Sequence, residues 1–136
     1  MLKIKKLTDS AICPTKAHST DLGYDLYADE NIFLYSSNIP VKIKTGIAVG
    51  FPEGWGGFIK DRSSRASQGW SIVGGVIDNA YIGELSVLIS GNTGSISKGD
   101  KIAQLVPIPL TQWDIVEVDS LSDTERGSKG FGSSGS

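Results

Sequence analysis

The stretch Gly74-Gly75-Val76-Ile77-Asp78-Asn79-Ala80-Tyr81-Ile82-Gly83-Glu84 decides how the rest of the chain is interpreted. Two apolar runs, Val76–Ile77 and residues 85–89, flank a polar bend that contains a glycine. Arms rich in β-branched residues around such a bend predict a β-hairpin, with Asn79 and Gly83 as turn residues.

Two side chains of this bend are candidates for contact with a ligand. Asp78 and Tyr81 fall where side chains leave the sheet. Gly74 and Gly75 precede them and would let a flat ligand approach the backbone closely. The alternative is an ordinary hairpin with an exposed aspartate and a packed tyrosine, and this stretch alone does not decide between the two.

Length and composition indicate one all-β domain. The chain has 136 residues, enough for one core, and its 17 glycines and 5 prolines separate short β-branched runs. A net charge of −2 argues against non-specific nucleic-acid binding. Cys13 is the single cysteine, which excludes an intramolecular disulfide and favours a reducing compartment. With no signal core or membrane-length apolar run, we expect a cytoplasmic protein without a membrane partner.

The rest of the chain alternates strands with turns. The first residues alternate apolar and basic side chains, as an edge strand does. Ser63 or Ser64 can cap one helical turn that Gly69 ends. Two prolines place the later half of one strand at a sheet edge. The strands are expected over residues 1–7, 22–28, 41–49, 55–60, 101–109 and 113–118.

Isolated polar residues mark further candidate positions. Asp25 interrupts an apolar strand, so it either caps a turn or needs a cation or an indirect metal contact. Gln104 lies in an apolar run and needs a protein or ligand partner. Arg62 at the start of a helix suits an anion, although solvated arginines are the alternative. His18 has no partner nearby and is interpreted as a solvated loop residue.

The C-terminal residues 121–136 differ in kind from the rest. Gly and Ser dominate them, as in a segment that cannot order itself. They are no phosphate-binding P-loop, because the Gly-Lys-Ser/Thr ending and the following helix are missing. A plain linker has no need of Arg126 and Phe131. An arginine, free backbone amides and one aromatic ring suit a flap that closes over phosphates and stacks on a base.

Taken together, these stretches resemble the five ordered motifs of the trimeric dUTP pyrophosphatase (dUTPase) family. The similarity runs from about residue 20 to the end of the chain. Leu22 stands where the family usually has Ala, and Asp61 where a small residue or Pro is common. Ile72 and Val73 occupy the region where many bacterial members carry an Asn. The five matching segments are residues 22–26, 61–64, 75–84, 99–105 and 126–135.

The resemblance implies a fold, an assembly and a reaction. The fold would be an antiparallel jelly-roll-like β-barrel over residues 1–120, with residues 121–136 as a flexible arm. Members are homotrimers whose three active sites are each built from all three chains. Motifs one, two and four would come from one subunit, motif three from the second and the tail from the third. The reaction is dUTP plus water to dUMP and pyrophosphate, with Mg²⁺ as cofactor.

The resemblance also implies a role for each site residue. Asp78 would be the general base, and Asp25 would hold Mg²⁺ through water. Tyr81 would lie under the deoxyribose and exclude a 2′-hydroxyl. The remaining residues would contact the substrate. These are Gly75, Val76, Ile77 and Asp78 for uracil, Arg62, Ser63, Ser64 and Gln104 for the phosphates, and Arg126, Phe131 and Gly132 from the arm.

Three other functions are compatible with such a fold. A dCTP deaminase shares it but resembles a different motif set and lacks an aromatic, glycine-rich tail. A non-catalytic or regulatory nucleotide-binding protein would be expected to have lost Asp78 or Arg126, and both are present. A purely structural jelly roll would have no use for the tail. The sequence therefore favours the enzyme.

Overall fold

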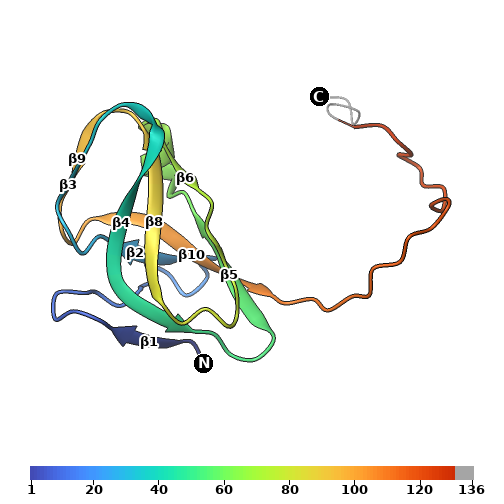
Figure 1. The fold of residues 1–136 in the computed structure, drawn as a ribbon, viewed down its shortest axis with the longest axis horizontal. Helices are drawn as coiled ribbons and strands as arrows, with labels where there is room; N and C mark the ends of the chain where they lie inside the picture. Colours follow the sequence, from blue (N-terminus) through green and yellow to red (C-terminus); the bar gives the residue numbers. More distant parts are fainter. Residues whose placement is uncertain (131–136) are drawn as a thin grey trace.

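The computed structural model describes residues 1–130 as a β-sandwich with one short helix and a long C-terminal arm (Figure 1). The described chain is almost entirely antiparallel β-structure, as predicted. Its elements are β1 (Lys3–Lys6), β2 (Tyr24–Tyr27), β3 (Ile32–Leu34), β4 (Ser37–Gly50), β5 (Trp55–Lys60), α1 (Ser63–Ser67), β6 (Trp70–Val73), β7 (Val76–Ile77), β8 (Glu84–Gly91), β9 (Gly94–Ile96) and β10 (Lys101–Pro109).

Two four-stranded sheets enclose the core. The first sheet has the order β1-β4-β8-β6, and the second has the order β2-β10-β5-β7. Among the described residues they remain separate sheets, so the jelly-roll-like barrel is not closed. The small β3–β9 sheet lies at one end (Figure 1). As predicted, β1 is an edge strand, and the later half of β10 pairs with β5 alone.

The core follows from the alternation of side chains along the strands. In β8, Leu85, Val87 and Ile89 are buried while the residues between them are partly exposed. They belong to one apolar cluster with residues from the second sheet, such as Leu26 and Leu105. This packing fixes the face that each strand turns outward, and therefore the positions of the polar side chains described below.

The predicted hairpin between β7 and β8 is wrong. β7 pairs with β5 in the second sheet, whereas β8 lies between β4 and β6 in the first. Residues 78–83 therefore carry the chain from one sheet to the other. A turn forms there, in which the Tyr81 amide donates to the Asp78 carbonyl at 3.1 Å. The reason is that the eight-residue β8 pairs along its length with both β4 and β6 in the first sheet. Pairing with the two-residue β7 would provide far fewer hydrogen bonds.

The expected capping of α1 is also wrong in detail. Arg62 is the N-cap, with extended backbone angles and no side-chain cap, and Ser63 is already helical. The Arg62 carbonyl accepts the Ala66 amide at 3.0 Å, which sets the start of the helix one residue earlier than a serine cap would. The stop at Gly69 is confirmed, since this residue has a φ of 88°.

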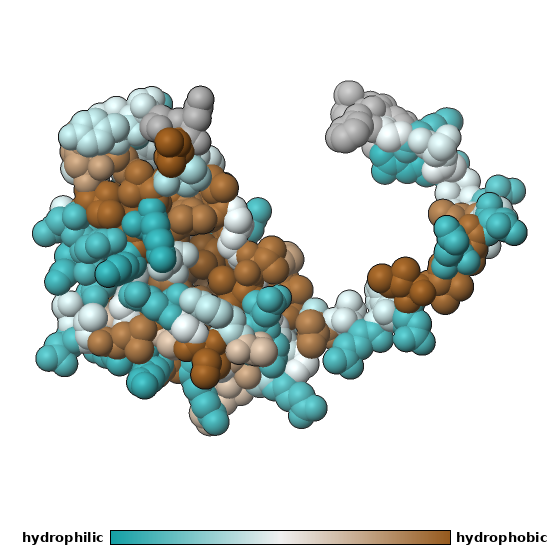
Figure 2. Space-filling model, in the orientation of Figure 1, coloured by the Kyte–Doolittle hydropathy of each residue, from teal (hydrophilic) through white to brown (hydrophobic). Residues whose placement is uncertain are grey.

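The strand expected over residues 113–118 is not formed within this chain. β10 ends at Pro109, and the following residues leave the sandwich as an extended arm (Figure 1). Trp113 is 84% exposed and Ile115 is 99% exposed, so the arm carries apolar surface (Figure 2). A strand needs a neighbouring backbone for its hydrogen bonds, and the described chain supplies none along this arm.

No helix among the described residues is long and apolar enough to cross a membrane.

Candidate functional site

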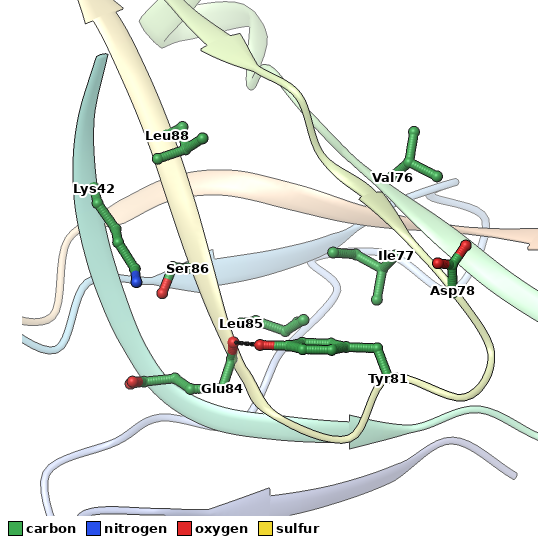
Figure 3. A pocket seen from close by; sticks show the side chains of 9 residues that line it. All are labelled: Lys42, Val76, Ile77, Asp78, Tyr81, Glu84, Leu85, Ser86 and Leu88. Atoms are coloured by element: carbon green, nitrogen blue, oxygen red, sulfur yellow. Dashed lines mark hydrogen bonds between the residues drawn. The ribbon is translucent and has the colours of Figure 1, made fainter. Parts of the chain in front are cut away.

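The loop between β7 and β8 forms one wall of a cavity of about 470 Å³, which we call the loop pocket (Figure 3). β4 contributes Lys42 and β8 contributes Ser86 to its other walls. Asp78 and Tyr81 both line it, as the sequence predicted for side chains at a bend. The pocket mixes an apolar floor with a carboxylate, a phenol and an ammonium group, which is the character of a small-molecule site.

Tyr81 is held in place by three features of its own loop. Its hydroxyl donates a hydrogen bond to the Glu84 carbonyl at 2.7 Å (Figure 3). The ring lies so close to Gly83 that a Cβ there would be 2.7 Å from the hydroxyl. The Glu84 carboxylate accepts the Gly46 amide at 2.9 Å and so fixes the start of β8. The ring therefore has a defined position although it is half-exposed.

β7 is the last strand of the second sheet, so one of its edges is free for a ligand. Ile59 donates to the Gly75 carbonyl at 2.7 Å, and Gly57 pairs with Ile77 two residues further on. Hydrogen-bonded and non-bonded pairs alternate in an antiparallel ladder, so the amide and carbonyl of Val76 point to the free edge. They form an adjacent donor and acceptor.

The paired glycines, which the sequence suggested would let a ligand approach, also have a packing role. Gly75 has a φ of 97°, and a Cβ there would be 2.6 Å from the Ile59 carbonyl oxygen. Close packing against β5 therefore requires a glycine at this position, whether or not a ligand approaches the backbone. Gly74 has a φ of 70° with open space around it.

A second, more polar cavity of about 270 Å³ lies where β2, β10 and the start of α1 meet, and we call it the polar pocket. The sequence predicted four of its residues as phosphate or metal contacts, and the fold brings all four together. They are Asp25, Arg62, Ser63 and Gln104.

Asp25 has the cation partners that its position in an apolar strand requires. Its carboxylate oxygens lie 3.0 Å from Arg62 Nε and 3.5 Å from Lys101 Nζ, and its side chain is only 16% exposed. These two cationic neighbours offset the cost of burying the carboxylate in an apolar strand. Ser64 Oγ accepts a long hydrogen bond from Arg62 Nη1 at 3.4 Å, but Ser64 does not line the polar pocket.

Gln104 has a protein partner that leaves part of its amide available. Its Nε2 donates to the Asp61 carbonyl at 2.7 Å. Gln104 lies directly opposite Asp25 in the β10–β2 ladder, so both side chains share one face of the sheet. Gly23 makes room for them, because a Cβ there would overlap Gln104 Oε1. The polar pocket is thus built by strand register.

The residues present fit a Mg²⁺ ion that arrives with a phosphate ligand. Residues 1–130 contain no group of three or more side chains that could hold a metal ion by themselves. Mg²⁺ keeps several waters and binds through one or two carboxylates together with substrate phosphates. Asp25, with Arg62 and Gln104 beside it, offers that single carboxylate.

The structure adds site residues that the sequence reasoning missed. Lys101 pairs with Asp25, Lys42 lines the loop pocket, and Asp61 Oδ1 accepts the Ile72 amide at 2.5 Å, which ties β6 to the start of α1. The sequence could have indicated Lys101, because it begins the same strand that carries the candidate residue Gln104. An exposed lysine on an alternating strand, such as Lys42, gives no such signal.

One chain does not bring all predicted residues together. Among residues 1–130, the loop pocket and the polar pocket share no lining residue. Arg126 lies on the arm, where its Nε donates to the Lys129 carbonyl at 2.8 Å. It lines neither pocket. Phe131 and Gly132 lie outside the described residues.

The dUTPase family profile matches residues 9–135. The chain belongs to the dUTPase family. It is 39% identical to the deoxyuridine 5′-triphosphate nucleotidohydrolase of Clostridioides difficile, over 98% of this chain and 97% of that protein. It is 37% identical to the protein of the same name from Paramecium bursaria Chlorella virus 1, over 98% of this chain and 97% of the viral one.

Solved dUTPase structures share this fold. A mutant dUTPase of Staphylococcus bacteriophage 80alpha with bound dUpNHpp superimposes with a TM-score of 0.86 at 32% identity, covering 100% of this chain and 99% of that one. A mutant dUTPase from phage phi11 of S. aureus has a TM-score of 0.80 at 29% identity, covering 88% and 97% respectively. That second structure is described as revealing the coordination of a structural Mg(II) ion.

Proposed function

We propose that this dUTPase hydrolyses the α–β phosphoanhydride of dUTP to dUMP and pyrophosphate, with Asp78 as general base. Asp78 lies on an exposed loop at the rim of the loop pocket, where its carboxylate can take a proton from an attacking water. Positioning and proton removal are the main tasks in phosphoryl chemistry, since the protein supplies little covalent chemistry itself. Two observations support this assignment: the chain belongs to the dUTPase family, and the polar pocket gathers Arg62, Ser63 and Gln104 as hydrogen-bond donors.

The loop pocket binds the nucleoside in this proposal. The outward amide and carbonyl of Val76 match the adjacent acceptor and donor of the uracil edge, in the way that a pairing base would. Gly75, Ile77 and Asp78 complete this stretch of backbone. The ring of Tyr81, fixed by the Glu84 carbonyl, lies under the deoxyribose and leaves no room for a 2′-hydroxyl. Such a steric wall matters, because apolar pockets reject an added hydroxyl by only about 10².

The polar pocket binds the phosphates in this proposal. Arg62, Ser63 and Gln104 donate hydrogen bonds to phosphate oxygens and stabilise the charge that develops there, with Ser64 assisting through Arg62. Asp25 holds waters of the Mg²⁺ ion. When bound, Mg²⁺ neutralises phosphate charge. Arg62 must then exchange its 3.0 Å contact with Asp25 for the nucleotide.

The separation of the two pockets carries the proposal that three chains share each active site. No residue in the described part of one chain lines both cavities, and its arm extends away from its own sandwich (Figure 1). In a homotrimer the loop pocket of one subunit would face the polar pocket of the next. The arm of a third subunit would bring Arg126 onto the phosphates, with Phe131 on the uracil ring and Gly132 beside it. The division into a domain of residues 1–120 and an arm of residues 121–136 belongs to this proposal.

Pyrophosphate release from dUTP, UTP, dTTP and dCTP, with and without Mg²⁺, tests the function directly. Of the four nucleotides, we expect only dUTP to release pyrophosphate at an appreciable rate. Mg²⁺ should strongly increase that rate. Release of ammonia from dCTP would instead identify a deaminase. Tight binding of dUTP without pyrophosphate release would identify a nucleotide-binding regulator. A cytoplasmic location remains part of the proposal, because a single cysteine forms no intramolecular disulfide and so suits a reducing compartment.

Mixed trimers test the shared site. Asp78→Asn and a chain truncated before Arg126 should each be inactive alone. Unfolded separately and refolded together, they should regain activity, because some sites combine Asp78 of the truncated chain with Arg126 of the other. Native mass spectrometry must show trimers of mixed mass. Mixed trimers without activity would refute the shared site and leave the dUTPase assignment intact.

A further inference from the structure

We propose that Arg65 is a positioning residue that holds the two walls of the polar pocket together while the nucleotide is bound. The inference rests on the proposed function of that pocket as the phosphate site. Arg65 lies on α1, does not line the pocket and touches none of the reacting groups in this proposal.

Arg65 makes three contacts outside α1, two at the start of β10 or just before it and one with β6. Its Nε donates to the Lys101 carbonyl at 3.3 Å, and its Nη2 lies 3.7 Å from Asp100 Oδ2. Its guanidinium lies 5.0 Å from the centre of the Trp70 ring. The side chain is 21% exposed, so these contacts are formed in a partly dry environment. Arg65 thus connects α1 to the first residue of β10 and to β6.

Two of the elements that Arg65 joins, α1 and β10, contribute to the walls of the polar pocket. Arg62 and Ser63 stand at the start of α1, on one wall. Gln104 and, through Lys101 Nζ, Asp25 are positioned by the start of β10, on the other. A shift of α1 relative to Lys101 would therefore change the spacing between the phosphate donors and the carboxylate that supports Mg²⁺.

The direct ties between these walls involve ligand-binding groups. Arg62 pairs with Asp25, and Gln104 donates to the Asp61 carbonyl. Arg62 has to leave Asp25 when a phosphate arrives, so the first tie is lost at the moment when spacing matters most. The Arg65 contacts involve no phosphate-binding group and persist through binding.

An arginine suits this position better than other residues do. Its planar fork can donate to a carbonyl and a carboxylate at the same time, while its face stacks on an aromatic ring. A lysine offers a point charge that can pair with Asp100 but cannot make all three contacts together. A leucine keeps apolar packing on Trp70 and loses both polar contacts.

The experiment compares the full-length wild type with Arg65→Leu, Arg65→Lys and a matched control, Lys3→Leu. Lys3 is a cation on β1 that lies outside both pockets. Calorimetry measures the affinity for dUMP and for the analogue dUpNHpp, the latter with and without Mg²⁺. Arg65→Leu should reduce the Mg²⁺-dependent gain in dUpNHpp affinity about ten-fold, the effect of losing one hydrogen bond to a charged group.

The binding of dUMP separates positioning from general damage. Since dUMP lacks the β- and γ-phosphates, the affinity of Arg65→Leu for dUMP should stay within about two-fold of the wild-type affinity. A two-fold change corresponds to less than about 0.5 kcal/mol of binding free energy. Arg65→Lys should fall between the wild type and Arg65→Leu, and Lys3→Leu should match the wild type. An unchanged Mg²⁺-dependent gain, or an equal loss for both nucleotides, would overturn the proposal.

A ligand-free measurement keeps this inference distinct from the proposed function. Hydrogen–deuterium exchange of the free protein should rise together in residues 61–68 and 98–104 of Arg65→Leu, because one side chain joins these segments. If the wild type binds no dUpNHpp, the proposed function fails. The exchange data still test whether Arg65 holds α1 against the start of β10. Unchanged exchange in either segment overturns the inference.

Discussion

Replacing Gly83 by alanine should weaken the discrimination between dUTP and UTP without disturbing the backbone. An ideal Cβ at Gly83 would lie 2.7 Å from the Tyr81 hydroxyl, 2.8 Å from Cζ and 3.0 Å from Cε1. Ordinary carbon contacts are about 3.5–4.0 Å, so the ring must move by about 1 Å. Gly83 is not among the glycines with positive φ, so alanine brings no backbone strain.

The size of the effect follows from what the displaced ring loses. Moving the ring breaks its hydrogen bond to the Glu84 carbonyl, and the ring is 46% exposed. Loss of this half-exposed hydrogen bond should therefore lower the free energy of unfolding by about 0.5–1 kcal/mol. The melting temperature should fall by only a few degrees, about 2–5 °C. The steric wall under the sugar should open enough for about a ten-fold loss in selectivity.

The assay is the ratio of kcat/KM values for dUTP and UTP in three variants. Tyr81→Ala removes the wall and should raise the relative activity on UTP most. Tyr81→Phe removes only the hydroxyl and should change the ratio by less than about five-fold. Gly83→Ala should lie between them. If Gly83→Ala leaves the ratio unchanged while Tyr81→Ala lowers it, Gly83 does not set the ring position. If neither changes it, Tyr81 is a packing residue.

Three further predictions concern other residues. Asp78→Asn should keep dUTP binding but lose about 10²–10⁴-fold in kcat, and turnover within a few-fold of wild type would refute the general base. Gly75→Ala should lower the free energy of unfolding in urea by about 2–3 kcal/mol, against about 1 kcal/mol for Gly74→Ala, because only the former meets the Ile59 carbonyl. The hydrogen bond from Thr8 holds the pKa of Asp29 below its ordinary value of 3.8, with a hydrogen bond from Ser10 and the charge of Lys98 acting the same way and desolvation opposing them. The ionised form therefore stabilises the fold above about pH 4 and loses this effect as the pH falls through the lower folded-state pKa. Asp29→Asn should reduce the melting temperature at pH 7, but not at a pH below the folded-state pKa of Asp29, where the wild-type carboxyl group is protonated as well. An equal reduction of the melting temperature at both pH values would contradict this prediction.

The sequence by itself determined the all-β class, most strand positions and four residues of the polar pocket. Alternation along β8 and β10 is a local property, so it can be read without the fold. Asp25 and Gln104 stood out because a polar side chain in an apolar strand needs a partner, and both have one. The resemblance of five ordered motifs to the dUTPases is confirmed by the family match.

The tertiary structure alone decided which strands pair and which side chains meet. Val76–Ile77 and the residues after Gly83 look like the arms of one hairpin, yet they join different sheets, because pairing depends on the partners available across the whole chain. Residues 113–118 have the composition of a strand but find no partner backbone within residues 1–130. The contacts of Lys101 became visible only in the fold, where its ammonium group pairs with Asp25 and its carbonyl accepts a hydrogen bond from Arg65 on α1. Local pattern fixes what a segment can form, whereas the contacts between distant segments fix what it does form.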